Sequence, residues 1–339
     1  MPRHPSGRRH ACTVTALTDR ATATLPDGEH WRQAPERSSM FWLRVMTWIS
    51  LRLGRGPSRV VLFGIAAYFL VFAPTARRMS RRYLQRVLQL DSSADVPWLA
   101  MYRHFLSFAS VIHDRIYLIN DRDELFDIRI HNQQLVDDLV ARGEGAFLIG
   151  AHLGSFEVLR AVGRRQPGLR VAMAMYEENA RKISAALAAI NPAAQQGVVA
   201  LGHIDSMMHV HDLLAQGTVV GMLGDRSLRN DDTHQVDFLG EPAALPLGPF
   251  RVAAIMKRPI LFMTGLYLGG NRYDIHFETL ADFSAVPVRG RALAVQDTIN
   301  RYAALLEQHC RAAPYNWFNF FDFWRAPAPR RKTPAAPQP

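Results

Sequence analysis

The sequence predicts an α/β fold, with a mostly parallel central sheet flanked by helices and a helical, membrane-associated segment at the N-terminus. Two observations predict this fold, and the cysteine content bears on the location of the protein. From about residue 146 onward, apolar runs of strand length alternate with amphipathic runs of helix length. The 339 residues are 48% hydrophobic, which is enough for a sizeable core. The two cysteines supply neither a disulfide framework nor a metal knuckle, which favours a cytoplasmic location.

Composition divides the chain into four segments. A polar stretch without periodicity, rich in Pro, Gly, Thr and Arg, predicts a disordered leader over residues 1–39. Apolar and Arg-rich runs predict membrane-associated helices over 40–90. The strand and helix patterns place one domain at 91–324, and the Pro, Ala and Arg repeats after it predict a disordered tail over 325–339.

The positive charge is concentrated at the N-terminus. Residues 1–90 contain 15 Arg and four acidic residues, so the rest of the chain is almost neutral. Residues 40–53 form an amphipathic stretch with Trp42 and Trp48, and residues 60–73 are apolar. As a helix, residues 60–73 cover about 21 Å, less than the roughly 30 Å of a bilayer core. We therefore expect a shallow anchor on an anionic, cytoplasmic membrane face and no nucleic-acid binding. Two alternatives remain for residues 60–73: a tilted helix that crosses the membrane once, and a helix buried in the protein core.

The remaining elements follow in order. Residues 80–120 are predicted to be two helices separated near residues 91–93 and Pro97; His104 and His113, on the second, are expected to be structural. Strands are predicted at 146–151, 169–175, 198–201, 218–224 and 259–267, with 272–278 returning as a hairpin partner. Helices are predicted at 178–190, 203–215, 248–257 and 291–311.

The central motif lies where the 146–151 strand ends. His152 follows the strand, Gly154 permits a sharp bend, and Ser155 has the position of a helix N-cap. On one continuous helix, residues five apart point roughly 140° away from each other. A turn ahead of the helix instead brings His152 to Glu157. A histidine held by a carboxylate is suited to general-base catalysis.

This His-x4-Glu turn resembles the signature of the lysophospholipid acyltransferase superfamily, and most of all the late (lauroyl/myristoyl) acyltransferases of bacterial lipid A synthesis. More of the pattern follows in order over roughly residues 95–324: Gly224-Asp225-Arg226, Phe238 to Ala243, and Leu247 to Phe250. The resemblance implies a cofactor-free and metal-free transferase at the cytoplasmic face of the inner membrane. Its donor would be an acyl thioester on acyl carrier protein, and its acceptor a hydroxyl of a membrane lipid or glycolipid.

The resemblance also implies roles. His152 would deprotonate the acceptor and Glu157 would stabilise the imidazolium, with backbone N–H groups of residues 153–156 holding the oxyanion. The 218–224 strand delivers Asp225 and Arg226 to the sheet edge that carries His152. Further residues are assigned to substrate binding: Arg226 and Arg229 bind a phosphate, Asp225 positions Arg226, and Phe238 to Gly240 line an acyl tunnel. The aromatic run from Tyr315 to Trp324 is interpreted as core, with a wall of the acyl tunnel as the alternative.

One stretch departs from the lipid A enzymes. They tend to have Tyr-Arg after the second strand, whereas this chain has Glu177 and Glu178 after Tyr176. The departure makes the chain similar to a branch of predicted acyltransferases linked to fatty-acid-synthase-like gene sets. Arg181 or Lys182 then replaces the missing cation.

Three alternative functions are considered: a metal-dependent hydrolase, a serine hydrolase and a non-catalytic scaffold. The group His203, Asp205, His209, His211 and Asp212 superficially resembles a metal cluster, as in a metal-dependent hydrolase. On a helix, however, His209 and His211 point about 160° apart and cannot share an ion. A serine hydrolase is disfavoured because Ser155 lacks the glycine pattern of a nucleophile elbow. A non-catalytic membrane scaffold is the remaining alternative, and it leaves His152 and Glu157 without a purpose.

Overall fold

The computed structural model describes residues 47–324, apart from residues 92, 192–196, 203 and 227–231. The predicted leader (1–39), the predicted tail (325–339) and Trp42 lie outside these described residues.

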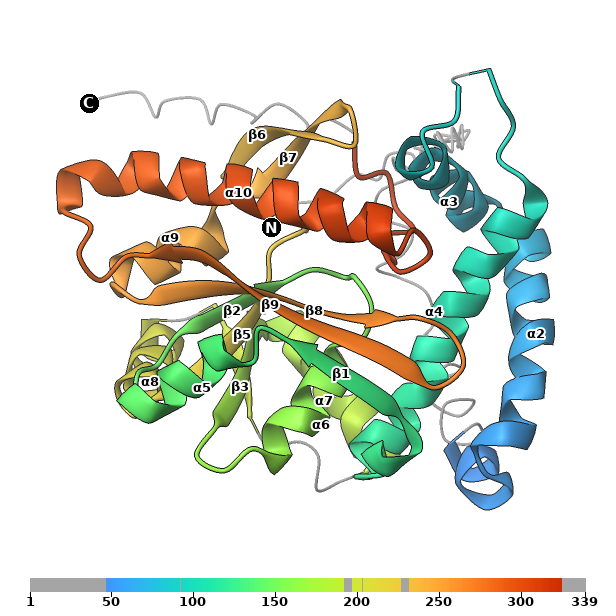
Figure 1. Cartoon of the computed structure of the whole chain (residues 1–339), viewed down its shortest axis with the longest axis horizontal. Coiled ribbons are helices and arrows are strands. Elements are labelled where there is room, and N and C mark those ends of the chain that lie inside the picture. Colours follow the sequence, from blue (N-terminus) through green and yellow to red (C-terminus); the bar gives the residue numbers. More distant parts are fainter. Residues whose placement is uncertain (1–46, 92, 192–196, 203, 227–231, 325–339) are drawn as a thin grey trace, which may run out of the picture. The chain divides into compact units, whose positions relative to one another are not determined.

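A seven-stranded sheet, in the order β1-β9-β8-β2-β5-β3-β4, forms the centre of the domain (Figure 1). β9 runs antiparallel to β8, and every other neighbouring pair is parallel. This confirms the predicted mostly parallel sheet and the hairpin. The strands are β1 Asp127–His131, β2 Phe147–Gly150, β3 Arg170–Tyr176, β4 Val198–Leu201, β5 Thr218–Leu223, β8 Pro259–Tyr267 and β9 Arg272–Asp282.

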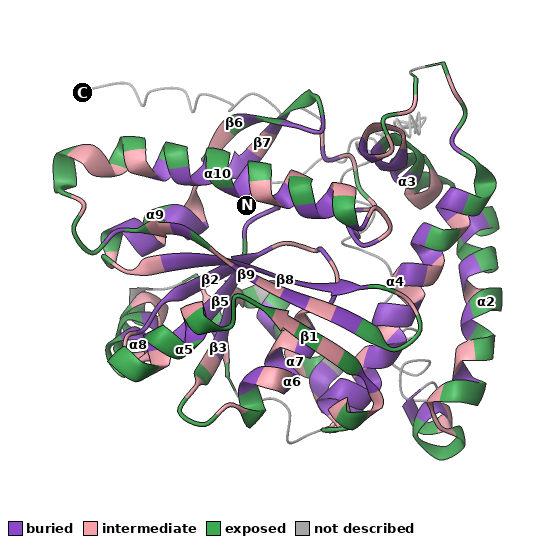
Figure 2. Ribbon diagram, viewed as in Figure 1, coloured by how far each residue is buried: buried purple, intermediate pink, exposed green. Residues whose placement is uncertain are grey.

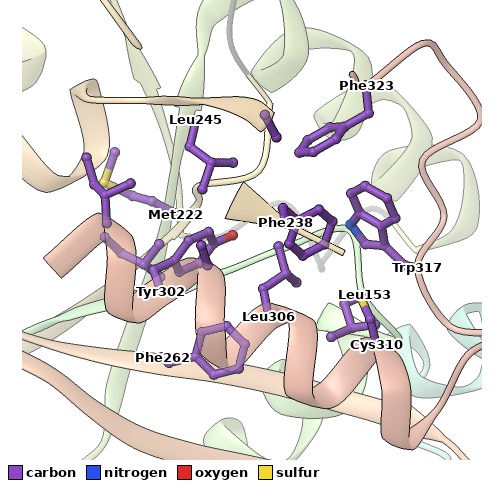
Figure 3. Packing of buried hydrophobic residues seen from close by; sticks show 14 of the residues in the cluster. Leu153, Met222, Phe238, Leu245, Phe262, Tyr302, Leu306, Cys310, Trp317 and Phe323 are labelled. Carbon is purple, nitrogen blue, oxygen red and sulfur yellow. The ribbon is translucent and has the colours of Figure 1, made fainter. Parts of the chain in front are cut away.

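Helices cover both faces of the sheet (Figure 1). One layer contains α5, α6 and α7 and the other contains α8, α9 and α10, so apolar side chains from alternate strand positions form two clusters. The cluster beneath α10 includes Phe262, Tyr302 and Leu306 (Figure 3). The helices are α4 Trp98–Ile119, α5 Gln134–Arg142, α6 Phe156–Arg165, α7 Glu177–Ile190, α8 Ile204–Ala215, α9 Gly248–Ile255 and α10 Arg291–Ala312, with short 3-10 turns at Asp123–Leu125 and Val288–Gly290.

Four elements were not predicted from the sequence. β1 and α5 precede the central motif, and a separate two-stranded hairpin consists of β6 (Thr233–Phe238) and β7 (Glu241–Pro246). The expected turn is present, with positive φ at Leu239 and Gly240, but the strands around it were missed. β7 contains two prolines, and a proline within a sequence run argues against a strand because it has no N–H group to donate. A two-stranded hairpin tolerates them, because each of its strands has one edge that is not paired.

Two helices precede α4. α2 (Arg55–Phe72) packs on α4 through Ser58, Leu62, Ala66 and Leu70, which recur every four residues and are buried. Its other side is exposed and apolar, as the green residues along α2 in Figure 2 indicate. Among the described helices, α2 is the one long and apolar enough to cross a membrane. α3 (Pro74–Val87) follows, and residues 47–53 are also helical.

A buried polar network fixes α2 to the domain. Arg55 donates to both carboxylate oxygens of Asp114 on α4, at 2.8 and 2.9 Å, and the Tyr273 hydroxyl donates to the same carboxylate at 2.9 Å. Ser58 Oγ lies 2.7 Å from His113 Nε2. Because these groups are buried, losing one partner is costly. The network therefore holds the apolar helix rigidly on the domain.

Several basic residues of the N-terminal segment form ion pairs within the protein. Arg55 pairs with Asp114 in the network described above. In α3, Arg81 pairs with Asp95, Arg82 with Asp322 and Arg86 with Glu241. The exposed side of α2 is therefore apolar, whereas these arginines of α3 are paired with acidic residues of the protein.

Candidate active site

The turn between β2 and α6 has a conformation that only glycine fits. Gly154 has φ of +71°, and a Cβ there would lie 2.1 Å from the carbonyl oxygen of Gly265 in β8. The Ser155 N–H donates to that carbonyl at 2.7 Å. Ser155 is the N-cap residue of α6, as predicted, but its buried side chain makes no capping hydrogen bond.

His152, in this turn, is held by Asp225. Its Nδ1 lies 2.9 Å from Asp225 Oδ1, and its backbone N–H donates to Oδ2 at 3.0 Å. Asp225 is fully buried and follows β5, the neighbour of β2 in the sheet. The two residues share a sheet edge, as the sequence predicts, but Asp225 holds the histidine itself.

The charge state of Asp225 determines the tautomer of His152. Burial alone raises the pKa of Asp225, but the nearby His152 ring, the hydrogen bonds from His152 and the charge of Arg226 outweigh burial and lower the pKa to about 2. An ionised carboxylate only accepts hydrogen bonds, so the Nδ1 of His152 carries the proton. In the neutral ring, the lone pair is then on Nε2, and the side chain as a whole is 29% exposed. Nε2 is therefore the nitrogen of His152 that can accept a proton.

The segment after α10 completes the surroundings of Asp225. Trp317 Nε1 and Asn319 Nδ2 donate to Asp225 Oδ2 at 3.2 and 3.3 Å, and the Phe318 N–H donates to the His152 carbonyl at 2.8 Å. Trp317 is also core, packed against Phe238 and Phe323 (Figure 3). The sequence pattern of this run predicted core or a tunnel wall, and not contacts with Asp225. The asparagines were the available signal, since a buried amide needs partners.

Asn316 and His104 hold the segment after α10 in place. Asn316 exchanges two hydrogen bonds with the backbone of Tyr267 at the end of β8, and its carbonyl accepts the Gly154 N–H at 2.9 Å. His104 lies between Ser80 Oγ and the Trp317 carbonyl, at 2.9 and 3.0 Å. Burial, partly offset by the bond to that carbonyl, lowers the pKa of His104 to about 4. Both His104 and His113 occupy buried polar positions, as expected for structural histidines.

Glu157 does not hold His152, contrary to the contact that the sequence predicts. It is buried in the first turn of α6, with its oxygens 3.8 Å from Arg115 and from Arg160. In the part of the chain that the structure describes, no hydrogen bond or ion pair joins it to His152. The reason is local: the imidazole turns toward the end of β5, and the carboxylate stays at the N-terminus of α6, where the helix dipole favours a negative charge.

The turn leaves few free backbone donors. The N–H groups of Gly154 and Ser155 bond to Asn316 and Gly265, so they are not available to an oxyanion. Of the predicted donors at 153–156, those of Leu153 and Phe156 make no hydrogen bond to another described residue. The second is in the first turn of α6, where N–H groups lack helical partners.

The other predicted substrate residues are spread around the site. Arg226 donates to Asn319 Oδ1 and to the Phe318 carbonyl, at 2.8 and 3.2 Å, and lies over the Phe321 ring. Arg181 is exposed in α7, and Arg229 lies outside the described residues. Phe238 is fully buried against Trp317, so its surroundings are those of core; Gly240 is in the β6–β7 turn.

Residues 29–326 match the family model of the bacterial lipid A biosynthesis acyltransferases. The chain belongs to this family. It is therefore an acyltransferase that acts on a lipid acceptor. A search of the curated proteins found no match. Among solved structures, it is similar to the crystal structure of the 1-acyl-sn-glycerophosphate (LPA) acyltransferase PlsC from Thermotoga maritima, with 12% identity, a TM-score of 0.35 and coverage of 80% of this chain and 98% of that one.

The site of this lipid A acyltransferase family member contains two buried carboxylates with different partners. Asp225 bonds to Nδ1 of His152 and fixes its tautomer, whereas Glu157 lies between two arginines. A general base needs one nitrogen oriented and the other open. His152 with Asp225 has this arrangement.

Proposed function

We propose that the enzyme transfers a fatty acyl group from a thioester on acyl carrier protein to a hydroxyl of a membrane lipid or glycolipid, with His152 as the general base. Family membership supports acyl transfer to a lipid. The observation that carries the proposed chemistry is the pairing of His152 Nδ1 with the buried Asp225, which leaves Nε2 as the acceptor of a proton.

In the proposed reaction, Nε2 removes the proton of the acceptor hydroxyl as its oxygen attacks the thioester carbonyl. The carbonyl oxygen becomes an oxyanion, and collapse of the tetrahedral intermediate forms the ester and breaks the carbon–sulfur bond. The leaving thiolate takes the proton from the imidazolium. Asp225 stabilises this imidazolium, and the N–H groups of Leu153 and Phe156 are the donors proposed for the oxyanion.

Two further roles belong to the proposal. Nε and Nη2 of Arg226 hold the segment after α10, and its Nη1, which makes no hydrogen bond to another described residue, is proposed to bind a phosphate of the donor arm or of an anionic acceptor. Glu157 acts as a positioning residue, because it lies between Arg115 and Arg160 at the start of α6. This assigns to Asp225 the orienting function that the sequence assigned to Glu157.

The proposed membrane surface is the exposed side of α2. Large apolar side chains gather there, and Trp98 at the start of α4 is exposed next to Arg77, which also caps the end of α2. An aromatic and aliphatic surface on a helix suits shallow insertion into the cytoplasmic face of the inner membrane. We call this surface the α2 patch: Val60, Val61, Phe63, Tyr68, Phe69, Val71 and Phe72.

The decisive experiment measures acyl transfer from an acyl-carrier-protein thioester into extracted membrane lipid, with wild type and His152→Gln compared. We expect loss of roughly 10² to 10⁴-fold in turnover, the usual contribution of a general base. Mass spectrometry of lipids from cells with either protein identifies the acceptor by the mass of one acyl chain. Wild-type turnover by His152→Gln would refute the mechanism.

A further inference from the structure

Three polar side chains meet at the outer edge of the sheet, on β1 and β9. The two strands are parallel, and their register pairs His131 with His276. Asp274 lies two residues before His276 and therefore points to the same face of β9. His131 Nε2 is 3.0 Å from Asp274 Oδ2, and one ligand atom from each of the three residues lies within 4.8 Å of the others.

We propose that His131, Asp274 and His276 bind one divalent transition-metal ion of the zinc class. Imidazole nitrogens suit zinc, copper and nickel, whereas magnesium and calcium require oxygen ligands. Two histidines and a carboxylate are three of the four ligands of a tetrahedral zinc ion, and water supplies the fourth. The ion would join the edge strand β1 to β9.

The spacing requires only a small adjustment. Zinc bonds of about 2.0 to 2.1 Å place tetrahedral ligand atoms about 3.4 Å apart. The rings of His131 and His276 are stacked, with centroids 4.3 Å apart and planes 4° from parallel, so their lone pairs run side by side. One ring must tilt for the lone pairs to converge. The His131 side chain is 44% exposed on an edge strand, which leaves room for this rotation.

Further side chains surround His276 on the side away from His131 and Asp274. On the inner side, His309 of α10 lies with its ring centroid 4.8 Å from that of His276, and its Nε2 is 2.6 Å from Glu278. Side chains that surround a metal ligand, as His309 and Glu278 surround His276, restrict the orientation of its ring.

The test is direct binding, which does not depend on acyl transfer. Tag-free full-length protein is stripped with a chelator, desalted and titrated with ZnCl2 by calorimetry, and with CoCl2 by visible absorption. We expect one saturable zinc site per chain, tetrahedral cobalt bands, and no competition from excess MgCl2. His131→Gln and His276→Gln should each weaken zinc binding at least about tenfold and remove the cobalt bands.

His211→Gln is the matched control, because His211 has a neighbouring carboxylate, Asp212 at 3.6 Å, but belongs to no three-ligand cluster in the described chain. It should bind zinc as wild type does. Circular dichroism and thermal unfolding check that each variant is folded, and zinc should raise the unfolding temperature of wild type more than that of His131→Gln. Absence of a saturable site in wild type, or wild-type affinity in both His131→Gln and His276→Gln, would overturn the proposal.

Discussion

Asp225 binds both the ring and the backbone of His152: Oδ1 is 2.9 Å from Nδ1, and Oδ2 accepts the backbone N–H at 3.0 Å. One carboxylate thus fixes the position of the turn and the tautomer of the base. Because the Trp317 and Asn319 side chains also donate to Oδ2, the carboxylate has little freedom to move.

The first prediction is that Asp225→Asn lowers turnover by roughly 10²-fold or more, with a smaller effect on KM. The amide lacks the negative charge that stabilises the imidazolium, and its NH2 group favours the wrong tautomer of His152. Steady-state kinetics with a thioester donor measures the effect. In a double-mutant cycle, Asp225→Asn should cost little more once His152 is already Gln; additive losses would show that Asp225 acts elsewhere.

The second prediction is that Glu157→Gln loses less turnover than Asp225→Asn. In the structure, Glu157 contacts Arg115 and Arg160, so neutralising it disturbs the start of α6 and not the base directly. Both variants are compared in one assay, after circular dichroism shows that they are folded. A larger loss in Glu157→Gln would restore the His152–Glu157 pair that the sequence suggests.

The third prediction concerns pH and stability. The pKa of Asp225 is depressed to about 2 in the folded protein, below its ordinary 3.8. A depressed carboxylate contributes stability above its unfolded pKa, here on the order of 2 kcal/mol, and this contribution is lost as pH falls through the folded value. Asp225→Asn should therefore be less stable than wild type at pH 7.

Chemical denaturation from pH 7 down to pH 2 measures that difference. We expect it to be constant above about pH 4 and to shrink below it. The same pKa means that Asp225 stays ionised throughout the working range, so an acidic loss of activity above pH 4 does not come from its protonation. A stability difference that disappears already between pH 7 and pH 5 would contradict this assignment.

Elements of the fold were predicted correctly where their sequence signals lie within a few residues of each other. Apart from β6 and β7, the order of strands and helices from residue 146 onward was predicted, and so was the position of Ser155, because both depend on hydrophobic period and turn chemistry within a few residues. β1 was missed although its polar and apolar residues alternate, because this edge strand has five residues and none of them is fully buried.

The candidate active site was also predicted only where the signal is local in the sequence. His152 and the edge that Asp225 shares with it follow from strand polarity, and both were predicted. The bond between them was not, because a His-x4-Glu spacing offers a nearer carboxylate and sequence distance does not show which way the ring turns. Trp317 and Asn319 reach Asp225 only after α10 has crossed the sheet, a long-range arrangement that no local pattern encodes.

The fourth prediction is that the α2 patch attaches the enzyme to membranes. Replacing Phe63, Phe69 and Phe72 by Ser should lower partitioning into anionic vesicles roughly 10²-fold, since each Phe contributes about 1 kcal/mol or more on insertion. Ile255→Ser, Val288→Ser and Leu293→Ser together form the matched control, because these side chains are similarly exposed on α9 and near α10. Vesicle sedimentation at low and high salt measures both triple variants. Equal loss in the two would show that α2 has no special role.

The fifth prediction separates acyl transfer from metal-dependent hydrolysis. The groups that bond to His152 and Asp225 are a tryptophan, an asparagine and backbone atoms, and metal-ligating side chains of the described chain gather instead on β1 and β9. Because the proposed base needs no ion, dialysis against a strong chelator should leave turnover within about twofold of the untreated enzyme. His131→Gln, which lacks a ligand of the proposed zinc site, should behave in the same way. If chelation abolished turnover and zinc or manganese restored it in both proteins, the reaction would depend on an ion bound elsewhere, and His152 would no longer suffice as the base.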